Sequence, residues 1–323
     1  MHPDRHTGLL LTASVLLGAC GGRGELSPPH GPYQMLRHPR ERTQLTYADP
    51  WHAEKLELLE RMNRDRAAVG APPLQYEPRA ARMGDRFCLE TTLAHSSGHF
   101  DTSGTAPFAR WGLAGGVDYH GQNVVAFSGA ATRGRSLREL LIEAHEAIMA
   151  ERPPDDGHRE LVLNPMFTHA GIGAALEGEE FRMTQELTRV GFEWIEIPDR
   201  PLPVGARARF AGQPLPGWRI AEVEIRWQAQ PTPGAGGEPT PSGSYAYPPV
   251  VRRLYPSPPP WMAYRGRVEW DFRVEPSGAF HVEFPLDSGP GASYVVCLLQ
   301  PWPPKRGERA EPATAALIRA VSE

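Results

Sequence analysis

The sequence predicts an α+β fold in which a domain of helices and strands precedes a small all-β domain resembling a β-sandwich. Three observations support this prediction. Apolar residues between Trp51 and Ala150 recur at helical spacing, whereas after Pro165 they alternate or form short runs. From about Pro198 onward no strong helical pattern appears before the tail, and proline is frequent. The length beyond residue 50, roughly 270 residues, suggests two domains, which we place at residues 51–197 and 198–323.

The first twenty residues indicate export from the cytoplasm. A polar start, MHPDRH, precedes the apolar run GLLLTASVLL, which is too short to span a bilayer, and then LGAC. This order is typical of a lipoprotein signal peptide, here residues 1–19, that is cleaved before a lipid-bearing cysteine. We therefore expect Cys20 to be lipidated and to anchor the mature protein to a membrane without spanning it. The alternative is a plain secretory signal with an incidental cysteine.

Residues 20–50 are predicted to form a flexible tether between the lipid and the folded domains. They are rich in Pro, Gly, His and Arg, and they show no hydrophobic period. Under either interpretation of the signal the protein leaves the cytoplasm. We expect it in the cell envelope, anchored to a membrane and facing the periplasm or the cell surface.

Charge and cysteine content narrow the classes of function. The formal net charge is -4 and the pI is about 6.3, with Arg and Glu interspersed and no basic stripe, which argues against a nucleic-acid partner. Cys88 and Cys297 fall within apolar patterns, one helical and one of strand type. They either pair in an oxidising envelope or remain buried thiols, and we favour two buried thiols.

Three helices are expected in the first domain. One has Leu56, Leu59, Met62 and Val69 along one side and is closed by Gly70. The second starts at Pro78, with Ala80, Met83, Phe87 and Cys88 on its inner side. The third opens with a capping box at Ser136 and Glu139, buries Leu137, Leu140, Leu141, Ala144 and Ile148, and stops at Pro153 and Pro154.

The strands follow in two groups. In the first domain we expect a hairpin of residues 170–176 and 181–187, and a further strand at 192–197. In the second domain, residues 268–274 and 280–284 alternate around Pro276-Ser277-Gly278 and predict a hairpin. Residues 218–227 and 293–299 supply further strands. We expect 231–260 to be a long excursion outside the core, and ATAALIRAV near the end fits helix or strand equally.

The order of motifs in the first domain resembles the CAP superfamily, which includes cysteine-rich secretory proteins, antigen 5 and plant pathogenesis-related proteins. The motifs are LLERMNRDRAAVGAPPLQYEPRAARMGDRF, GHFDTSGTAPFARWGL, GQNVVA, MAERPPDDGHRELVLNPMFTHAGIGAA and FRMTQELTR, and the bacterial branch is the closer likeness. This resemblance implies a three-layer α-β-α sandwich with a cleft in which two histidines and two carboxylates meet. In some members that cleft binds a divalent metal such as zinc.

The resemblance also carries over individual residues of the expected site. His99 matches the first histidine and His158 the second histidine of bacterial members, while Glu151 matches the acid at the end of the long helix. Gln122 stands where the family usually has a glutamate, and Arg182 stands where animal and plant members place their second histidine. The resemblance therefore implies a site of bacterial type that lacks one acid.

Three classes of function remain open for this site. Gln122 has no proton to exchange near neutral pH, which favours a binding module for a lipid, glycan or protein over an enzyme. The alternative is a metal-assisted, peptidase-like hydrolase that uses His99, Glu151 and His158, with His99 and His158 as metal ligands. The third class is a structural envelope protein, in which His99 closes a turn and His158 caps a loop. We assign no site role to His120, His145 or His169, and structural roles to Asn164 and Gly171.

Overall fold

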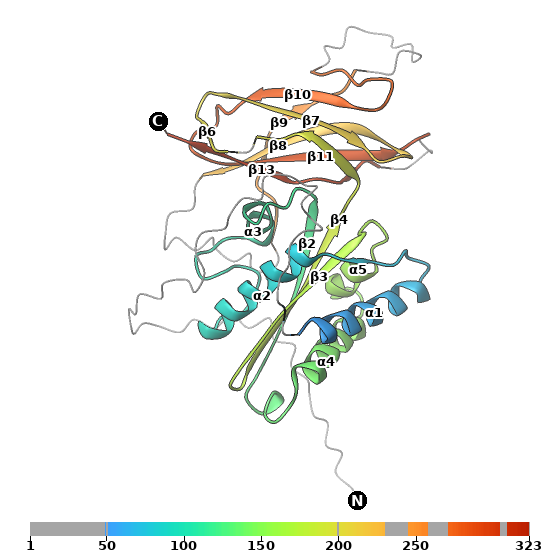
Figure 1. The fold of residues 1–323 in the computed structure, drawn as a ribbon, viewed down its shortest axis with the longest axis vertical. Helices are drawn as coiled ribbons and strands as arrows, with labels where there is room; N and C mark the ends of the chain where they lie inside the picture. The colour runs from blue at the N-terminus through green and yellow to red at the C-terminus, as the bar shows by residue number, and fades with distance from the viewer. Residues whose placement is uncertain are drawn as a thin grey trace, which may run out of the picture.

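The computed structural model describes residue 49 and residues 51–198, 200–229, 245–257, 271–303 and 309–322 (Figure 1). The predicted signal peptide, Cys20 and almost all of the predicted tether lie outside the described residues. Within the described residues, no helix is both long enough and apolar enough to cross a membrane.

A four-stranded sheet forms the centre of the first region. Its order is β1-β3-β4-β2, with bounds β1 (Gln75–Tyr76), β3 (His169–Glu177), β4 (Glu180–Arg189) and β2 (Tyr119–Ser128). β3 and β4 are antiparallel neighbours joined at Gly178, which has a φ of 61°, so the predicted hairpin is confirmed. β2 pairs antiparallel with β4 and forms one edge of the sheet.

Helices cover both faces of this sheet (Figure 1). α2 (Pro78–Leu93) packs on β3 and β4, and the short α3 (Pro107–Leu113) contacts β2. The other layer holds α1 (His52–Ala68), α4 (Leu137–Ala150) and α5 (Gly157–Leu163), while η2 (Gly129–Ala131) follows β2. The α-β-α sandwich is therefore confirmed, as is the capping box of Ser136 and Glu139 that opens α4.

Glycine allows α2 to lie very close to the sheet. A Cβ added at Gly171 would lie 2.2 Å from the backbone nitrogen of Ala81, and one at Gly173 would lie 2.2 Å from the carbonyl carbon of Gly84. Any side chain at these positions would force the helix away from β3. The structural role predicted for Gly171 is confirmed.

α1 departs from its predicted inner face at its last turn. Leu59 and Met62 are buried as expected, but Val69 is 55% exposed. Arg66 is buried in its place, and its guanidinium donates to the carbonyls of Pro72, Val162, Asn164 and Phe167 at 2.6–3.0 Å. The buried side of α1 therefore ends in an arginine instead of an apolar residue. Burial of this charge is tolerated because four backbone carbonyls accept its hydrogen bonds.

The C-terminal region is all-β and consists of two sheets that face a common apolar core. One sheet has the order β10-β7-β5, with β5 (Phe192–Glu196), β7 (Arg207–Pro214) and β10 (Phe280–Pro285). The other has the order β6-β13-β11-β8-β9, with β12 paired to β11. Its strands are β6 (Leu202–Pro203), β8 (Trp218–Ala229), β9 (Val250–Leu254), β11 (Gly291–Pro301), β12 (Glu311–Pro312) and β13 (Ala316–Val321).

Several strand predictions for this region need correction. β5 was expected in the first domain, but it pairs with β7, and Phe192 and Trp194 belong to the core of the C-terminal region. β10 alternates as predicted but pairs with β7; only Val274 bridges to Phe280 from the predicted hairpin partner, and residues 268–270 lie outside the described residues. The tail forms a strand, β13.

The expected excursion at 231–260 is wrong for residues 245–257. Residues 230–244 and 258–260 are not described, but residues 245–257 pack against the rest of the molecule. Leu254 joins the apolar core, and Tyr247 stacks on Phe108 of α3 with ring centroids 4.4 Å apart. Its high proline and glycine content therefore led to the wrong prediction that these residues lie outside the core.

The two regions share an interface around α3. Phe108 meets the edge of Tyr294 at 5.1 Å, and the Arg189 guanidinium donates to the carbonyl of Pro312 at 2.7 Å.

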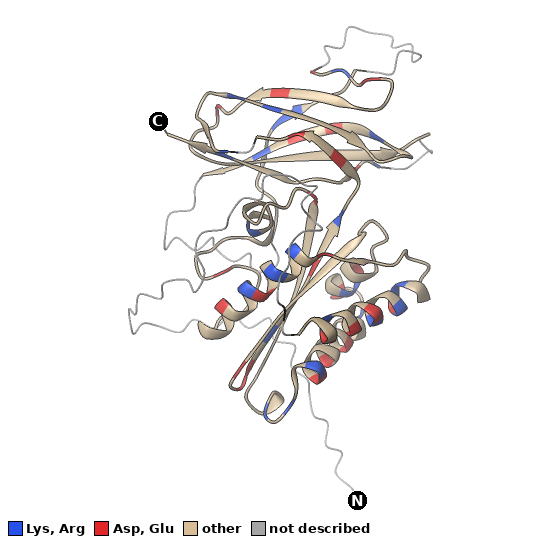
Figure 2. Ribbon diagram, viewed as in Figure 1, with Lys and Arg blue, Asp and Glu red and all other residues tan. Residues whose placement is uncertain are grey.

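Charged side chains of both signs are interspersed along α1, α2 and α4 (Figure 2). Cys88 and Cys297 are buried free thiols, as predicted, and burial raises the pKa of both.

Candidate functional site

His99 lies on the loop between α2 and α3, and this loop is held by local hydrogen bonds. The Oδ1 atom of Asp101 accepts from the backbone of Ser103 and Thr105 at 3.0 and 2.8 Å, which folds the segment into a turn. Arg110 of α3 donates to the carbonyls of His99 and Thr105 at 2.9 and 2.6 Å. The loop therefore presents His99 from a fixed backbone, although no regular element contains it.

A chain of side-chain hydrogen bonds connects His99 to a buried carboxylate. His99 Nδ1 lies 3.0 Å from Gln122 Oε1, and Gln122 Nε2 donates to Glu186 Oε1 at 2.8 Å. Glu186 Oε2 lies 2.8 Å from His120 Nε2, and the ring of His120 stacks on that of Trp111. Gln122 and Glu186 are cross-strand partners on β2 and β4, so their side chains share one face of the sheet.

The chain determines how His99 presents its ring. Because Gln122 gives its amide hydrogen to the Glu186 carboxylate, its oxygen faces His99, and Nδ1 of His99 must carry the hydrogen. The free lone pair of the neutral ring is then on Nε2. Burial lowers the pKa of His99, the hydrogen bond to Gln122 opposes this shift, and the nearby charge of His158 adds to it. His99 is therefore a neutral acceptor near pH 7.

Glu186 is ionised although it is fully buried. Burial by itself would raise its pKa, but the hydrogen bond and charge of His120, the charge of Arg110 and the hydrogen bond from Gln122 together lower it. The resemblance implied a site one acid short at Gln122. In the structure, the Glu186 carboxylate accepts a hydrogen bond from this same amide.

The second histidine contacts a carboxylate directly. His158 is the second residue of α5, not part of a loop, and its Nδ1 lies 2.6 Å from Glu151 Oε1. Glu151 is the C-cap residue that follows α4, and its other oxygen accepts the backbone N–H of Arg159 at 3.1 Å. The imidazole is 43% exposed and the carboxylate 8% exposed. The ring of His158 therefore reaches solvent, whereas the Glu151 carboxylate is largely covered.

Consecutive residues of β2 connect the two histidines. Gln122 contacts His99, and Asn123 donates to the carbonyl of His158 at 2.9 Å. β2 thus contacts both histidine-bearing segments at adjacent residues, and His158 is near enough to act on the pKa of His99. We call His99, Gln122, Glu151 and His158 the paired-histidine site.

A second polar chain extends from Asn123 to the far side of the helical layer. Asn123 donates to Gln185 Oε1 at 3.0 Å, and Gln185 Nε2 contacts His145 Nδ1 at 3.1 Å. His145 Nε2 lies 2.8 Å from Asp65 Oδ2 of α1. Burial lowers the pKa of His145, against the raising effect of Asp65.

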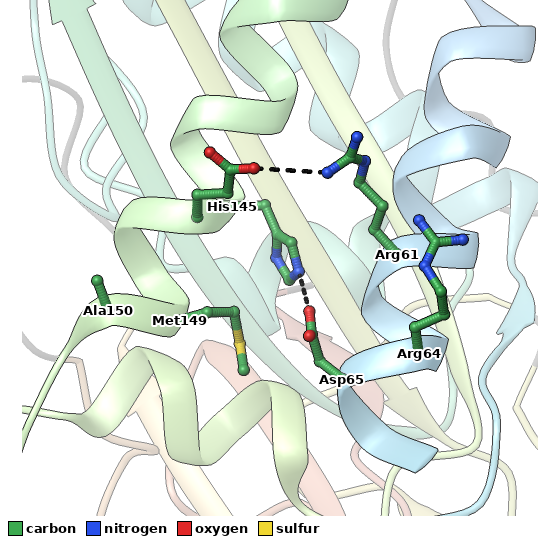
Figure 3. Close-up of a pocket in the computed structure, with 7 residues that line it drawn as sticks. Arg61, Arg64, Asp65, His145, Met149 and Ala150 are labelled. Carbon is green, nitrogen blue, oxygen red and sulfur yellow. Dashed lines mark hydrogen bonds and ion pairs between the residues drawn. The ribbon is translucent and has the colours of Figure 1, made fainter. Parts of the chain in front are cut away.

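This chain ends at a surface cavity of about 370 Å³ between α1 and α4 (Figure 3). In Figure 3 His145 points from α4 toward Asp65 on α1, with Arg61 and Arg64 alongside. A second cavity of about 380 Å³ adjoins it and shares Asp65 and Met149. Neither cavity is lined by His99 or His158.

Sequence reasoning missed Glu186 and His120 as parts of the site. Glu186 follows Thr184-Gln185 in the quoted TQEL motif, and β4 was predicted as a strand. Alternation of Phe181, Met183 and Leu187 with other residues was available as a signal that Glu186 lies on the opposite face of its strand. The register of Glu186 against β2 was not available.

Hydrogen bonds occupy the carboxylate that a metal at the two histidines would use as its third protein ligand. Both oxygens of Glu151 already accept hydrogen bonds, from His158 and Arg159. In the part of the chain that the structure describes, no group of three or more His, Cys, Asp or Glu side chains is arranged to hold a metal ion. A divalent metal held by His99 and His158, with one carboxylate as the third ligand of an open site, stays a prediction.

Comparison with known proteins gives a family match for the first region. The model of the cysteine-rich secretory protein family, CAP, matches residues 59–187. No curated protein matches the chain.

Three similar solved structures are bacterial. An outer surface protein from Borrelia burgdorferi is 11% identical, with 43% of this chain and 94% of that chain covered and a TM-score of 0.35. An extracellular protein with an SCP domain from Bacillus anthracis is 17% identical, with 50% and 45% covered and a TM-score of 0.32. A cysteine-rich secretory protein from Staphylococcus aureus is 17% identical, with 45% and 40% covered and a TM-score of 0.29.

Proposed function

Since residues 59–187 form a CAP domain of the cysteine-rich secretory protein family, we propose that this protein is a non-catalytic binding module of the bacterial cell envelope. A lipid on Cys20 holds it at a membrane, and the paired-histidine site contacts its ligand. The anchor is supported by LGAC after a short apolar run. Mass spectrometry of the membrane-extracted protein tests the anchor, and an unmodified chain that starts after residue 20 would remove it from the proposal.

The observation that carries the binding role is the amide between His99 and the buried carboxylate. In general acid–base catalysis a carboxylate or imidazole exchanges protons with its neighbour. Gln122 contacts His99 at 3.0 Å and Glu186 at 2.8 Å and exchanges a proton with neither. This arrangement orients His99 and leaves its Nε2 as a hydrogen-bond acceptor.

The ligand chemistry that suits neutral imidazole acceptors is a hydroxyl-rich molecule such as a glycan. Hydroxyl groups donate hydrogen bonds to the ring nitrogens without requiring a change in protonation. Purified murein sacculi serve as the probe, with wild type, His99→Ala and His158→Ala compared in a sedimentation assay. Saturable binding that both substitutions weaken supports the proposal. Binding that neither substitution changes, or no binding to sacculi, contradicts a glycan ligand.

A hydrolase is the second candidate, because the Glu151 and His158 pair is in hydrogen-bond contact at 2.6 Å and partly exposed. A carboxylate-oriented imidazole of this kind is able to take a proton from water. The same sacculus samples decide this question when the supernatant is analysed for released fragments. Release that disappears in Glu151→Gln and His158→Ala would establish hydrolysis and overturn the non-catalytic proposal.

Metal dependence is tested separately by calorimetric titration with zinc. If His99 and His158 hold the ion, binding weakens in both His→Ala variants and as the pH drops through the histidine range, about 6.5. No saturable binding in the wild type near neutral pH, or equal binding in both variants, would contradict a metal at these residues.

A further inference from the structure

A tyrosine from the C-terminal region lies against the paired-histidine site. Tyr245 precedes β9, and its phenolic oxygen accepts the backbone N–H of Gln122 at 2.7 Å. Its ring meets that of His99 edge-on, with centroids 4.8 Å apart and an interplanar angle of 61°. Tyr245 thus contacts two members of the site from a region outside the CAP domain.

This contact occurs at the edge of the CAP sheet. β2 is an edge strand, so backbone groups on its outer side have no strand partner and need other acceptors and donors. Tyr245 satisfies the outward N–H of Gln122. Two residues later, Tyr247 stacks on Tyr119 of β2 at 5.6 Å and on Phe108 at 4.4 Å. The two tyrosines therefore lie along β2, and Tyr245 is the one at the site.

We propose that Tyr245 is a positioning residue of the paired-histidine site, which is complete only when the C-terminal region is docked on the CAP domain. The ring of Tyr245 covers one side of the His99 imidazole, and its hydroxyl fixes the backbone of Gln122, whose side chain orients His99. The inference rests on the proposed function for the meaning of the site. Its geometry and its test require no ligand.

The surroundings of His99 support this role. The groups that face it are Gln122 of β2, Glu186 of β4, Arg110 of α3 and His158 of α5, and burial has the largest effect on its pKa. Burial, His158 and Arg110 lower the pKa of His99, whereas the hydrogen bond to Gln122 and the charge of Glu186 raise it. Tyr245 adds a neutral wall, since burial raises the pKa of its phenol far above neutrality. It keeps water from the imidazole without supplying a charge.

The test measures how fast diethyl pyrocarbonate modifies His99, relative to His158 in the same sample, by mass spectrometry of the full chain. We expect Tyr245→Ala to raise the His99 to His158 ratio several-fold, because the covering ring is gone. Tyr247→Ala is the matched control: it removes an equal ring two residues away and should leave the ratio unchanged. An unchanged ratio in Tyr245→Ala, or an equal rise in Tyr247→Ala, would overturn the proposal.

Tyr245→Phe separates the hydroxyl from the ring and is available if the alanine variant does not fold. With the ring retained, His99 modification should match the wild type. The amide hydrogen of Gln122 should exchange faster, because its acceptor is lost. Unchanged exchange at Gln122 would show that the hydroxyl does not position this strand, and the proposal would fail. Because no ligand is added, these results are independent of sacculus binding.

Discussion

The two histidines of the paired-histidine site differ in the hydrogen-bond partners of their Nδ1 atoms. Nδ1 of His99 meets an amide, Gln122, and the carboxylate of Glu186 lies one hydrogen bond further on and is fully buried. Nδ1 of His158 meets the carboxylate of Glu151 with no intervening group, and its ring is 43% exposed. One imidazole is tied to a buried chain, and the other to a carboxylate near the surface.

This difference assigns different chemistry to the two rings. A buried chain that ends in an ionised carboxylate holds its members in one arrangement, because every alternative leaves a charge without partners. His99 is therefore fixed as an acceptor. His158 reaches solvent and contacts a carboxylate directly, an arrangement that general acid–base catalysis uses. In the proposed function, His99 therefore recognises a ligand by its fixed geometry, and any proton transfer in this site would involve His158.

The largest effect should come from removing the buried charge of Glu186. Glu186→Gln takes away the ion that His120 and Gln122 both contact, and all three side chains are buried. We expect a loss of roughly 3 kcal/mol in the free energy of unfolding. Urea denaturation at pH 7 measures it. A loss below about 1 kcal/mol would mean that the chain behind His99 is no more rigid than a surface pair.

Gln122→Glu should break the same chain by adding a charge. The new carboxylate would lie where Gln122 Nε2 now meets Glu186 Oε1 at 2.8 Å. Two carboxylates at that distance hold one proton between them, so one of the two pKa values rises strongly. We expect a loss of about 2 kcal/mol at pH 7, and a smaller loss at pH 5, where the extra proton is available.

Gln122→Met is the matched control for this substitution. It removes the hydrogen bonds of Gln122 without adding a charge, so its deficit should not shrink between pH 7 and pH 5. An acid at position 122 should therefore weaken the fold here, because Glu186 of β4 already supplies a carboxylate at this place. A Gln122→Glu protein as stable as the wild type at pH 7 would contradict this account.

The elements that position the site were predictable because local signals specify them. Ser136 and Glu139 form the capping box that opens α4, and Glu151, the residue after α4, contacts His158. Gly178 turns the hairpin that carries Glu186. Capping and turn chemistry depend on residues a few positions apart, which a single sequence displays directly.

The remaining features depend on contacts between distant residues. Glu186 pairs with His120 across 66 positions, and Tyr245 reaches Gln122 across 123. Arg66 fills an apolar position of α1 only because carbonyls from α5 and its loop surround it. A buried charge looks like a surface charge in sequence, since its partners are chosen by the fold.

Glu151→Gln should have a much smaller effect than Glu186→Gln. A glutamine oxygen still accepts from His158 Nδ1, and the half-exposed ring keeps its contact with water. We expect a loss of about 0.5 kcal/mol in the free energy of unfolding at pH 7, the range of a solvent-screened pair. The same urea experiment measures both variants. Equal losses for Glu151→Gln and Glu186→Gln would remove the contrast between the two histidines.

Acidification should cause the mildest change, a gradual loss of stability through the histidine range. The pKa values of His99 and His145 are lowered in the folded protein, mainly by burial, whereas both rings in the unfolded chain titrate near 6.5. Below that pH the unfolded state therefore binds more protons than the folded state. The stability that these neutral rings contribute is complete above about 6.5 and is lost as the pH falls through their folded values. Urea midpoints of the wild type should decline from pH 7 toward pH 5.5, and the double variant His99→Gln/His145→Gln should decline less. A double variant that follows the wild-type curve would show that the buried rings are not the source of the decline, and that His99 is not held neutral by its surroundings.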